Sequence, residues 1–119
     1  IEKRDGLITW DRDDAGTIAR QVRAYNPWPM AYSNLDGQPL RIVEAIALAD
    51  NASAQAPGTI VEARAEASAL DLSDIAFAVI AAHGALGVIR VQPPGGNAMS
   101  AAAYLNGHRD IIGKRLTSG

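Results

Sequence analysis

The chain contains no cysteine, which excludes disulfide bridges and thiolate metal ligands and agrees with a cytoplasmic protein. It also lacks any run of about 18 apolar residues, so we expect no membrane-spanning segment. Residues 1–5 do not have the pattern of a secretory signal peptide. The sequence therefore predicts a cytoplasmic protein that does not enter the membrane.

An excess of basic charge is missing as well. Eleven Lys and Arg stand against thirteen Asp and Glu, for a net charge of −2, whereas a domain that binds a phosphate backbone by itself is usually basic. With 119 residues, of which 48% are apolar and 20% charged, residues 1–119 have the composition of one globular domain. Because the first residue is Ile1 and not methionine, we expect this domain to be a piece of a longer protein.

An amphipathic helix of about ten residues is predicted near the start of the chain. Ile18, Val22 and Tyr25 fall at positions i, i+4 and i+7 and share one face, which needs a sheet to lie on. The carboxylates between Asp11 and Asp14 are candidates for its N-cap.

Two hairpins are predicted from turn signals that separate β-rich segments. Asp36-Gly37 joins residues 31–35 to 38–44, and His83-Gly84 joins residues 75–81 to 85–92. Further strands are expected at residues 7–10 and 59–62, and a short helix that Ser100 caps is expected to end at Asn106-Gly107. The pattern predicts a small, mostly antiparallel barrel or curled sheet with a helix across one side, and residues 63–74 fit a strand, a short helix or a surface loop.

The corner Pro27-Trp28-Pro29 is stiff and extended, because each proline fixes φ near −65° and disfavours helix in the residue before it. Trp28 either fills the core between two elements or is presented to a partner.

No catalytic or metal-binding constellation is found in the sequence. His83 and His108 lie at predicted turns without a serine, carboxylate or second histidine at a suitable spacing. The glycine-rich residues 93–97 lack the lysine and serine or threonine of a phosphate loop. We therefore expect no catalytic residue, no metal site and no cofactor site in this chain.

The basic residues are scattered, and two interpretations of them stay open: a solvated surface, or a shallow groove that follows a nucleic-acid backbone. The period of two in a strand places Arg41 and Arg90 on solvent faces. The candidate nucleic-acid-binding residues are Arg20, Arg23, Arg41, Arg90, Arg109, Lys114 and Arg115.

Several short motifs occur in the order found in one known family. They are Ile8-Thr9-Trp10, residues 20–29, Asp36-Gly37, Pro57-Gly58-Thr59-Ile60-Val61, Gly84-Ala85-Leu86 and residues 99–107. Each is weak alone, but a helix that leads into Asn-Pro-Trp-Pro and is followed by Pro-Gly-Thr-Ile-Val is specific. Over nearly its full length the chain resembles the C-terminal domain of the methionyl-tRNA formyltransferases, within the formyltransferase C-terminal domain superfamily.

The resemblance implies a mainly β, α+β fold: an open six-stranded antiparallel barrel, similar to the OB-fold, with one amphipathic helix and a short C-terminal helix. It also implies an N-terminal catalytic domain, absent here, that takes the formyl group from 10-formyltetrahydrofolate, so we expect this chain alone to be inactive. In the tRNA enzymes the C-terminal domain helps to hold the initiator tRNA, which makes initiator tRNA and the catalytic domain the expected partners. The resemblance favours a core position for Trp28.

Two departures from the family pattern keep a second function open. Met30 stands where the family usually has glycine, and Gly96-Asn97-Ala98 replace a segment that is commonly basic. The same module occurs in formyltransferases that act on a small amine, such as a nucleotide sugar or the hydroxyornithine of siderophore synthesis, where it serves structure or interdomain contact.

Overall fold

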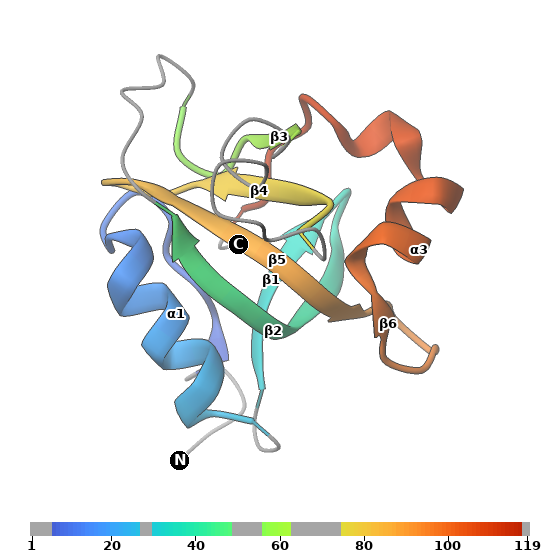
Figure 1. Ribbon diagram of the computed structural model, residues 1–119, viewed down its shortest axis with the longest axis horizontal. Coiled ribbons are helices and arrows are strands. Elements are labelled where there is room, and N and C mark those ends of the chain that lie inside the picture. The colour runs from blue at the N-terminus through green and yellow to red at the C-terminus, as the bar shows by residue number, and fades with distance from the viewer. Residues whose placement is uncertain (1–5, 27–29, 49–55, 63–74, 118–119) are drawn as a thin grey trace.

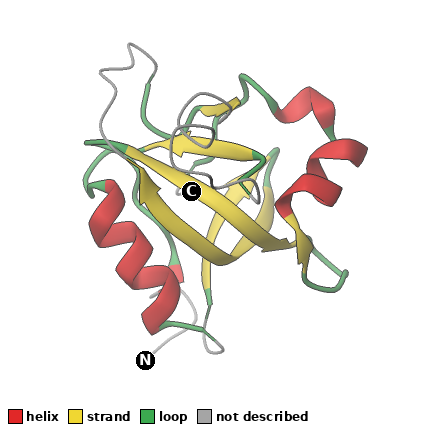
Figure 2. Cartoon of the chain, in the orientation of Figure 1, coloured by secondary structure: helices red, strands yellow, loops and turns green. Residues whose placement is uncertain are grey.

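The computed structural model describes residues 6–26, 30–48, 56–62 and 75–117 (Figure 1). Within these ranges the fold is a curved antiparallel sheet with helices at its sides, which agrees with the predicted open, OB-like barrel (Figure 2). The predictions for the Pro27–Pro29 corner and for residues 63–74 lie outside the described residues. No helix in the described ranges has the length and apolar character needed to cross a membrane.

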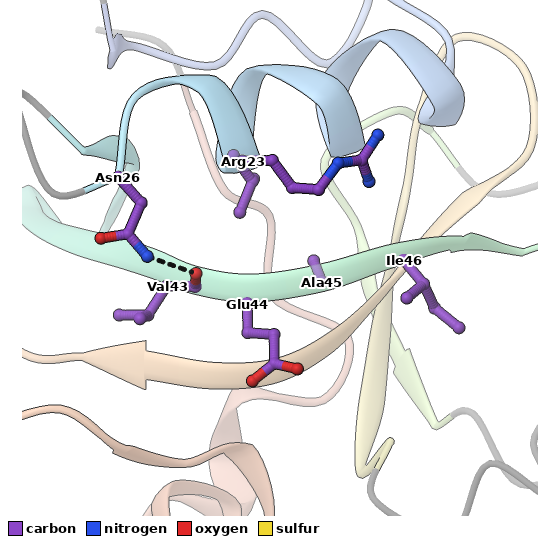
Figure 3. A pocket seen from close by; sticks show the side chains of 7 residues that line it. Arg23, Asn26, Val43, Glu44, Ala45 and Ile46 are labelled. Atoms are coloured by element: carbon purple, nitrogen blue, oxygen red, sulfur yellow. Dashed lines mark hydrogen bonds between the residues drawn. The ribbon is translucent and has the colours of Figure 1, made fainter.

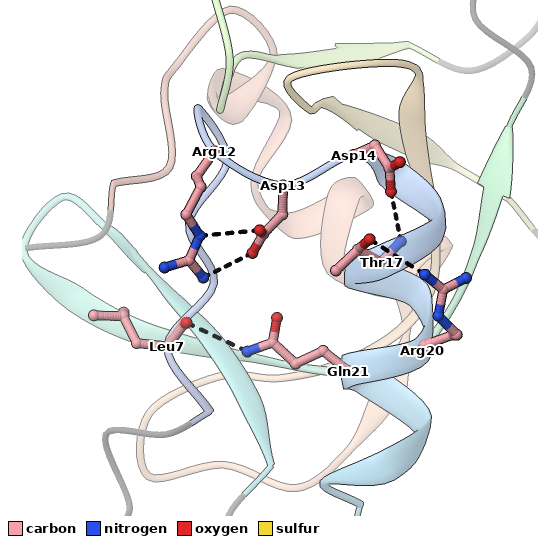
Figure 4. Close-up of polar contacts among 7 residues, drawn as sticks. All are labelled: Leu7, Arg12, Asp13, Asp14, Thr17, Arg20 and Gln21. Carbon is pink, nitrogen blue, oxygen red and sulfur yellow. Dashed lines mark hydrogen bonds and ion pairs between the residues drawn. The ribbon is translucent and has the colours of Figure 1, made fainter.

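The predicted amphipathic helix is confirmed as α1, Ala15–Ala24. It buries Ile18 and Val22 against the sheet, and its contacts are most extensive with strand β2, Gln38–Leu48. The Asp14 side chain caps it, because its Oδ1 accepts a hydrogen bond of 2.7 Å from the backbone N–H of Thr17 (Figure 4). Of the acidic residues before the helix, Asp14 is therefore the one that acts as the N-cap.

Protonation of Asp14 is expected to weaken this cap. The hydrogen bond from Thr17 holds the pKa of Asp14 below its ordinary value, so the carboxylate stabilises the fold above about pH 4 and loses this effect as the pH falls through the lowered pKa. Asp14→Asn keeps a cap that does not titrate, so its melting temperature should fall less between pH 5 and 3 than that of the wild type. Asp14→Ala should melt a few degrees lower than the wild type at pH 7. If the melting temperatures of the wild type and Asp14→Asn fall equally between pH 5 and 3, this explanation is contradicted.

The first predicted hairpin is formed by β1, Ala31–Leu35, and β2, Gln38–Leu48. Asp36 and Gly37 both have positive φ, of 53° and 82°, as a tight hairpin turn requires. The strand β2 runs four residues beyond its predicted end. It is irregular near Glu44, where a bulge shifts its pairing with residues 85–92, the strand beside it in the sheet.

The second predicted hairpin is also confirmed. Its strands are β4, Phe77–Ile80, and β5, Ala85–Gln92, and β3, Ile60–Glu62, pairs with β4. The order across the described sheet is β1-β2-β5-β4-β3, and a short strand β6, Met99–Ser100, pairs with β5. Ser100 caps the predicted short helix, α3, Ala101–Gly107, which a 3₁₀ turn, η2, Arg109–Ile111, follows.

One predicted strand is not formed as expected. Residues 7–10 contribute only a parallel bridge between Leu7 and Tyr32, with the Ile8 N–H donating to the Tyr32 carbonyl at 2.9 Å. The reason is that this segment soon turns: the Asp13 N–H donates to the Thr9 carbonyl at 3.1 Å, just before α1 begins. The sixth strand of the described sheet is instead β6, which the sequence did not indicate.

Residues 113–117, called here the C-terminal strap, lie between the two edge strands of the sheet. Thr117 bridges Asn34 of β1 through two backbone hydrogen bonds of 2.9 Å. On the other side the Leu116 N–H donates to the Gly58 carbonyl at 2.8 Å, and the Ile60 N–H donates to the Lys114 carbonyl at 2.9 Å. The strap thereby closes the gap between β1 and β3, and Leu116 adds a side chain that is 2% exposed.

The main core fills the concave side of the sheet and extends under α1. Phe77 and Ile8 are among its fully buried side chains. Trp10 is buried as well, and its Nε1–H donates to Ser33 Oγ at 2.9 Å, while the Ser33 hydroxyl donates to the Thr117 carbonyl at 2.9 Å. This relay joins the segment before α1, the strand β1 and the strap.

Candidate nucleic-acid interface

The seven candidate cations lie in three places on the fold. Arg20 and Arg23 are exposed on α1, Arg41 and Arg90 lie on the neighbouring strands β2 and β5, and Arg109, Lys114 and Arg115 follow α3. The predicted outward direction of Arg41 and Arg90 is confirmed, since Arg90 is exposed, Arg41 is partly exposed, and their strand neighbours Ile42 and Val91 are buried in the core.

Most of these cations already bond within the domain. Lys114 Nζ lies 2.7 Å from Asp36 Oδ2 and 3.3 Å from Asp110 Oδ2, and these hydrogen bonds raise the pKa of Lys114. Four arginines donate one hydrogen bond each: Arg20 to Thr17 Oγ1 (3.3 Å), Arg90 to the Ala98 carbonyl (3.4 Å), Arg109 to Asn106 Oδ1 (3.0 Å) and Arg115 to the Pro57 carbonyl (2.8 Å). Lys114 is the least suited to bind phosphate, because two carboxylates compensate its charge.

The side chains of Arg23 and Arg41 form no hydrogen bond or ion pair with the residues that the structure describes. Arg23 extends from α1 along a groove of about 420 Å³ between this helix and β2 (Figure 3). Asn26 closes one end of the groove by donating from Nδ2 to the Val43 carbonyl at 3.4 Å. Glu44 also lines the groove but points from β2 away from the helix, so the Arg23 guanidinium keeps its donors free.

Arg41 lies in a row of three residues on the outer face of the sheet. The register pairs Tyr32 with Arg41 and Arg41 with Gln92, so the three residues stand side by side on β1, β2 and β5. We call Tyr32, Arg41 and Gln92 the outer row. Tyr32 is not among the candidates predicted from the sequence, although its alternation with the small residues Ala31 and Ser33 was a signal that it faces away from the core.

The two histidines lie in different connections of the fold, His83 between β4 and β5 and His108 between α3 and η2. His83 is exposed, and its backbone carbonyl accepts a hydrogen bond of 2.9 Å from the Ala15 N–H. His108 is exposed and stacks on Tyr104 with ring centroids 4.2 Å apart. Among the described residues, no group of three or more His, Asp or Glu side chains is placed to hold a metal ion.

The acidic residues before α1 have structural partners. Asp13 pairs with Arg12 through two hydrogen bonds of 3.0 Å, which raise the pKa of the Arg12 guanidinium, and Asp14 caps the helix (Figure 4). Gln21 fastens the preceding segment to the helix by donating to the Leu7 carbonyl at 3.3 Å. This region thus positions α1, and with it Arg23.

The fold defines a class: an OB-like open barrel, which here carries exposed basic side chains on α1, on the sheet and after α3. The chain belongs to the family of formyl transferase C-terminal domains, whose family model matches residues 1–109. The whole strap, residues 113–117, lies beyond the matched residues.

Curated relatives and solved structures agree with this assignment. Methionyl-tRNA formyltransferase of Stenotrophomonas maltophilia (strain R551-3) is 43% identical over 93% of this chain, and that of Methylococcus capsulatus is 42% identical over 98%. The chain spans about a third of the length of these relatives, 33% in both cases. A crystal structure of HypX from Aquifex aeolicus in complex with tetrahydrofolic acid has the same fold, with a TM-score of 0.69 at 18% identity over 94% of this chain and 18% of that chain.

Proposed function

We propose that this domain helps to hold initiator methionyl-tRNA in a formyltransferase that uses 10-formyltetrahydrofolate. The observation that carries the proposal is the identity of 42–43%, over nearly the whole chain, to proteins named methionyl-tRNA formyltransferase. We assign formyl transfer and binding of the folate to an N-terminal catalytic domain outside this chain. We assign the reaction to the cytoplasm, where translation begins. The domain itself then contributes binding and not chemistry.

The positions of the two arginines whose side chains have no partner among the described residues support this role. Arg23 lines the groove with Val43 and Glu44, where β2 is irregular, and Arg41 lies two residues before Val43 on the same strand. A phosphate that approaches either arginine replaces water and displaces no internal hydrogen bond, whereas a phosphate at Lys114 competes with two carboxylates. We therefore assign the principal phosphate contacts to Arg23 and Arg41, and secondary contacts to Arg20, Arg90, Arg109 and Arg115.

A salt-dependent titration with initiator tRNA tests the proposal. We expect log K to fall steeply with log salt, and Arg23→Glu and Arg41→Glu to weaken binding at least several-fold and to reduce the magnitude of the slope by about 1 each. The measurement is made with the full-length protein that carries this domain and with the domain alone.

Arg12→Glu is the matched control for this titration. Arg12 is 72% exposed, lies in the turn before α1 and is paired with Asp13, so the same charge change there should alter tRNA binding much less. Equal effects at Arg12, Arg23 and Arg41 would mean that only net charge matters, and a flat salt response of the wild type would contradict tRNA binding by this domain.

A structural role in a formyltransferase that acts on a small amine is the second candidate. It is favoured by the exposed residues 94–98, Pro-Gly-Gly-Asn-Ala, which carry no positive charge between β5 and β6. In that case the Arg23→Glu and Arg41→Glu proteins would formylate their small amine at the wild-type rate and would not bind tRNA above background.

A further inference from the structure

The outer row presents an aromatic ring and a guanidinium side by side. Ala31 and Ser33 are fully buried on either side of Tyr32, so the alternation of β1 turns the Tyr32 ring outward. Leu40 and Ile42, both 1% exposed or less, flank Arg41 in the same way on β2. Tyr32 and Arg41 are direct cross-strand partners, so their side chains leave the same face of the sheet as close neighbours.

The side chains of Tyr32 and Arg41 make no hydrogen bond, ion pair or ring contact with the part of the chain that the structure describes. Tyr32 is partly exposed on this OB-like sheet and offers a flat surface for a nucleobase, and the adjacent arginine offers charge-assisted donors for the phosphate of the same nucleotide. We propose that the Tyr32 and Arg41 pair is a stacking site for an unpaired nucleotide of RNA.

The neighbouring residues limit where such a nucleotide lies. At one end of the outer row Gln92 Nε2 donates to the Gly96 carbonyl at 3.1 Å, which keeps residues 93–98 against the sheet edge and occupies Gln92. In the next row Glu44 is paired in register with Arg90, so its carboxylate offsets the charge of that arginine and leaves it less able than Arg41 to bind a phosphate. The proposed position of the nucleotide is therefore above Tyr32 and Arg41. Because a base in a duplex is stacked on its neighbours and cannot reach a flat sheet face, the site selects an unpaired nucleotide.

This inference deepens the proposed function and rests on it, since it names the part of the tRNA that this face contacts. The test is fluorescence anisotropy of a labelled, unstructured eight-nucleotide RNA, and of the same strand annealed into a duplex, with the complete 119-residue chain. We expect Tyr32→Leu to weaken binding of the single strand about 5- to 100-fold, and Tyr32→Phe to leave it unchanged, because stacking needs the ring and not the hydroxyl. Arg41→Glu should weaken binding several-fold and reduce the slope of log K against log salt by about 0.7.

The variants separate the stacking site from general charge and from folding. Arg12→Glu, the same charge change in the turn before α1, should bind the single strand nearly as well as the wild type. Tyr32→Trp enlarges the ring and should bind at least as tightly as the wild type, which keeps the test decisive if Tyr32→Leu proves unstable. The proposal is overturned if folded Tyr32→Leu binds like the wild type, or if Tyr32→Phe binds as weakly as Tyr32→Leu. It is also overturned if Tyr32→Trp binds more weakly than the wild type, or if the duplex binds as well as the single strand.

Parallel titrations with initiator tRNA distinguish this inference from the proposed function. If tRNA binds the wild type and Tyr32→Leu equally, the stacking site is wrong and the proposed function stands. If tRNA does not bind the wild type while the single strand binds in a Tyr32-dependent way, the assignment to tRNA fails and the stacking site stands.

Discussion

Ending the chain at Gly113 is expected to unfold the domain at 37 °C. The truncation removes the Leu116 side chain, whose burial stabilises a fold by about 2–3 kcal/mol, and the backbone hydrogen bonds that the strap makes to Asn34, Gly58 and Ile60. It also leaves the Trp10 and Ser33 relay without its final acceptor, the Thr117 carbonyl. The loss should reach on the order of 5 kcal/mol, which is comparable with the whole free energy of unfolding of a typical domain.

Urea unfolding followed by tryptophan fluorescence and circular dichroism measures this effect, because buried Trp10 reports on the end of the barrel that the strap closes. Lys114→Met is the control: it removes the ion pairs to Asp36 and Asp110 and keeps the backbone of the strap, so its midpoint should stay near that of the wild type. If the truncated chain unfolds at the same urea midpoint as the wild type, the strap does not contribute to the stability of the fold.

The strap also matters for the candidate interface. It pairs with Asn34 on β1, and β1 carries Tyr32 on its outer face two residues earlier. The Lys114 side chain reaches Asp36 in the turn of the same hairpin. A cation that looks like a ligand contact in the sequence therefore serves to fix the strand that presents the outer row. The proposed binding roles are therefore assigned to the basic side chains that have no partner among the described residues, and not by exposure alone.

Elements that depend on neighbouring residues could be predicted from the sequence. The helix α1 follows from the spacing of Ile18 and Val22 and from the cap at Asp14, and the first hairpin follows from Asp36-Gly37. These signals are local, since a cap or a tight turn is satisfied within a few residues. The same local rules predicted the second hairpin and the short helix that Ser100 caps.

Elements that depend on long-range pairing could not be predicted. The strap has no strand pattern of its own, and its partners Asn34 and Gly58 are distant in the sequence. The two-residue strand β6 exists because β5 offers it an edge. Residues 7–10 have strand composition, yet the turn that starts α1 ends their pairing after one bridge. Pairing between distant segments decides these elements, and composition carries little information about it.

The candidate site was predicted as a set of residues but not as an arrangement. Exposure of Arg41 and Arg90 follows from the period of two in a strand, which needs no knowledge of the fold. Only the folded sheet shows that Lys114 bonds Asp36, 78 residues earlier in the chain. It also shows that the Arg41 side chain has no such partner among the described residues. The register also places Tyr32 beside Arg41, which gives the aromatic component that a list of basic residues lacks.

Gly58→Ala is expected to be among the most destabilising single substitutions in the chain. Gly58 has a φ of 92°, where a non-glycine residue costs about 1–2 kcal/mol. A Cβ atom there would also overlap the carbonyl oxygen of Leu116 in the strap, which is backbone and cannot rotate away. Displacing it disturbs the hydrogen bond from the Leu116 N–H to the Gly58 carbonyl, so we expect about 1–3 kcal/mol more.

Gly113→Ala separates the two causes, because Gly113 has the same φ of 92° and no atom within 4 Å of its added Cβ. Thermal and urea unfolding of both variants should show a loss of about 1–2 kcal/mol for Gly113→Ala and a clearly larger one for Gly58→Ala. The difference between them measures how firmly the strap is held, since a loosely attached strap would move aside for the methyl group. Equal losses would therefore contradict a firmly attached strap, and they would also predict that truncation after Gly113 is mild.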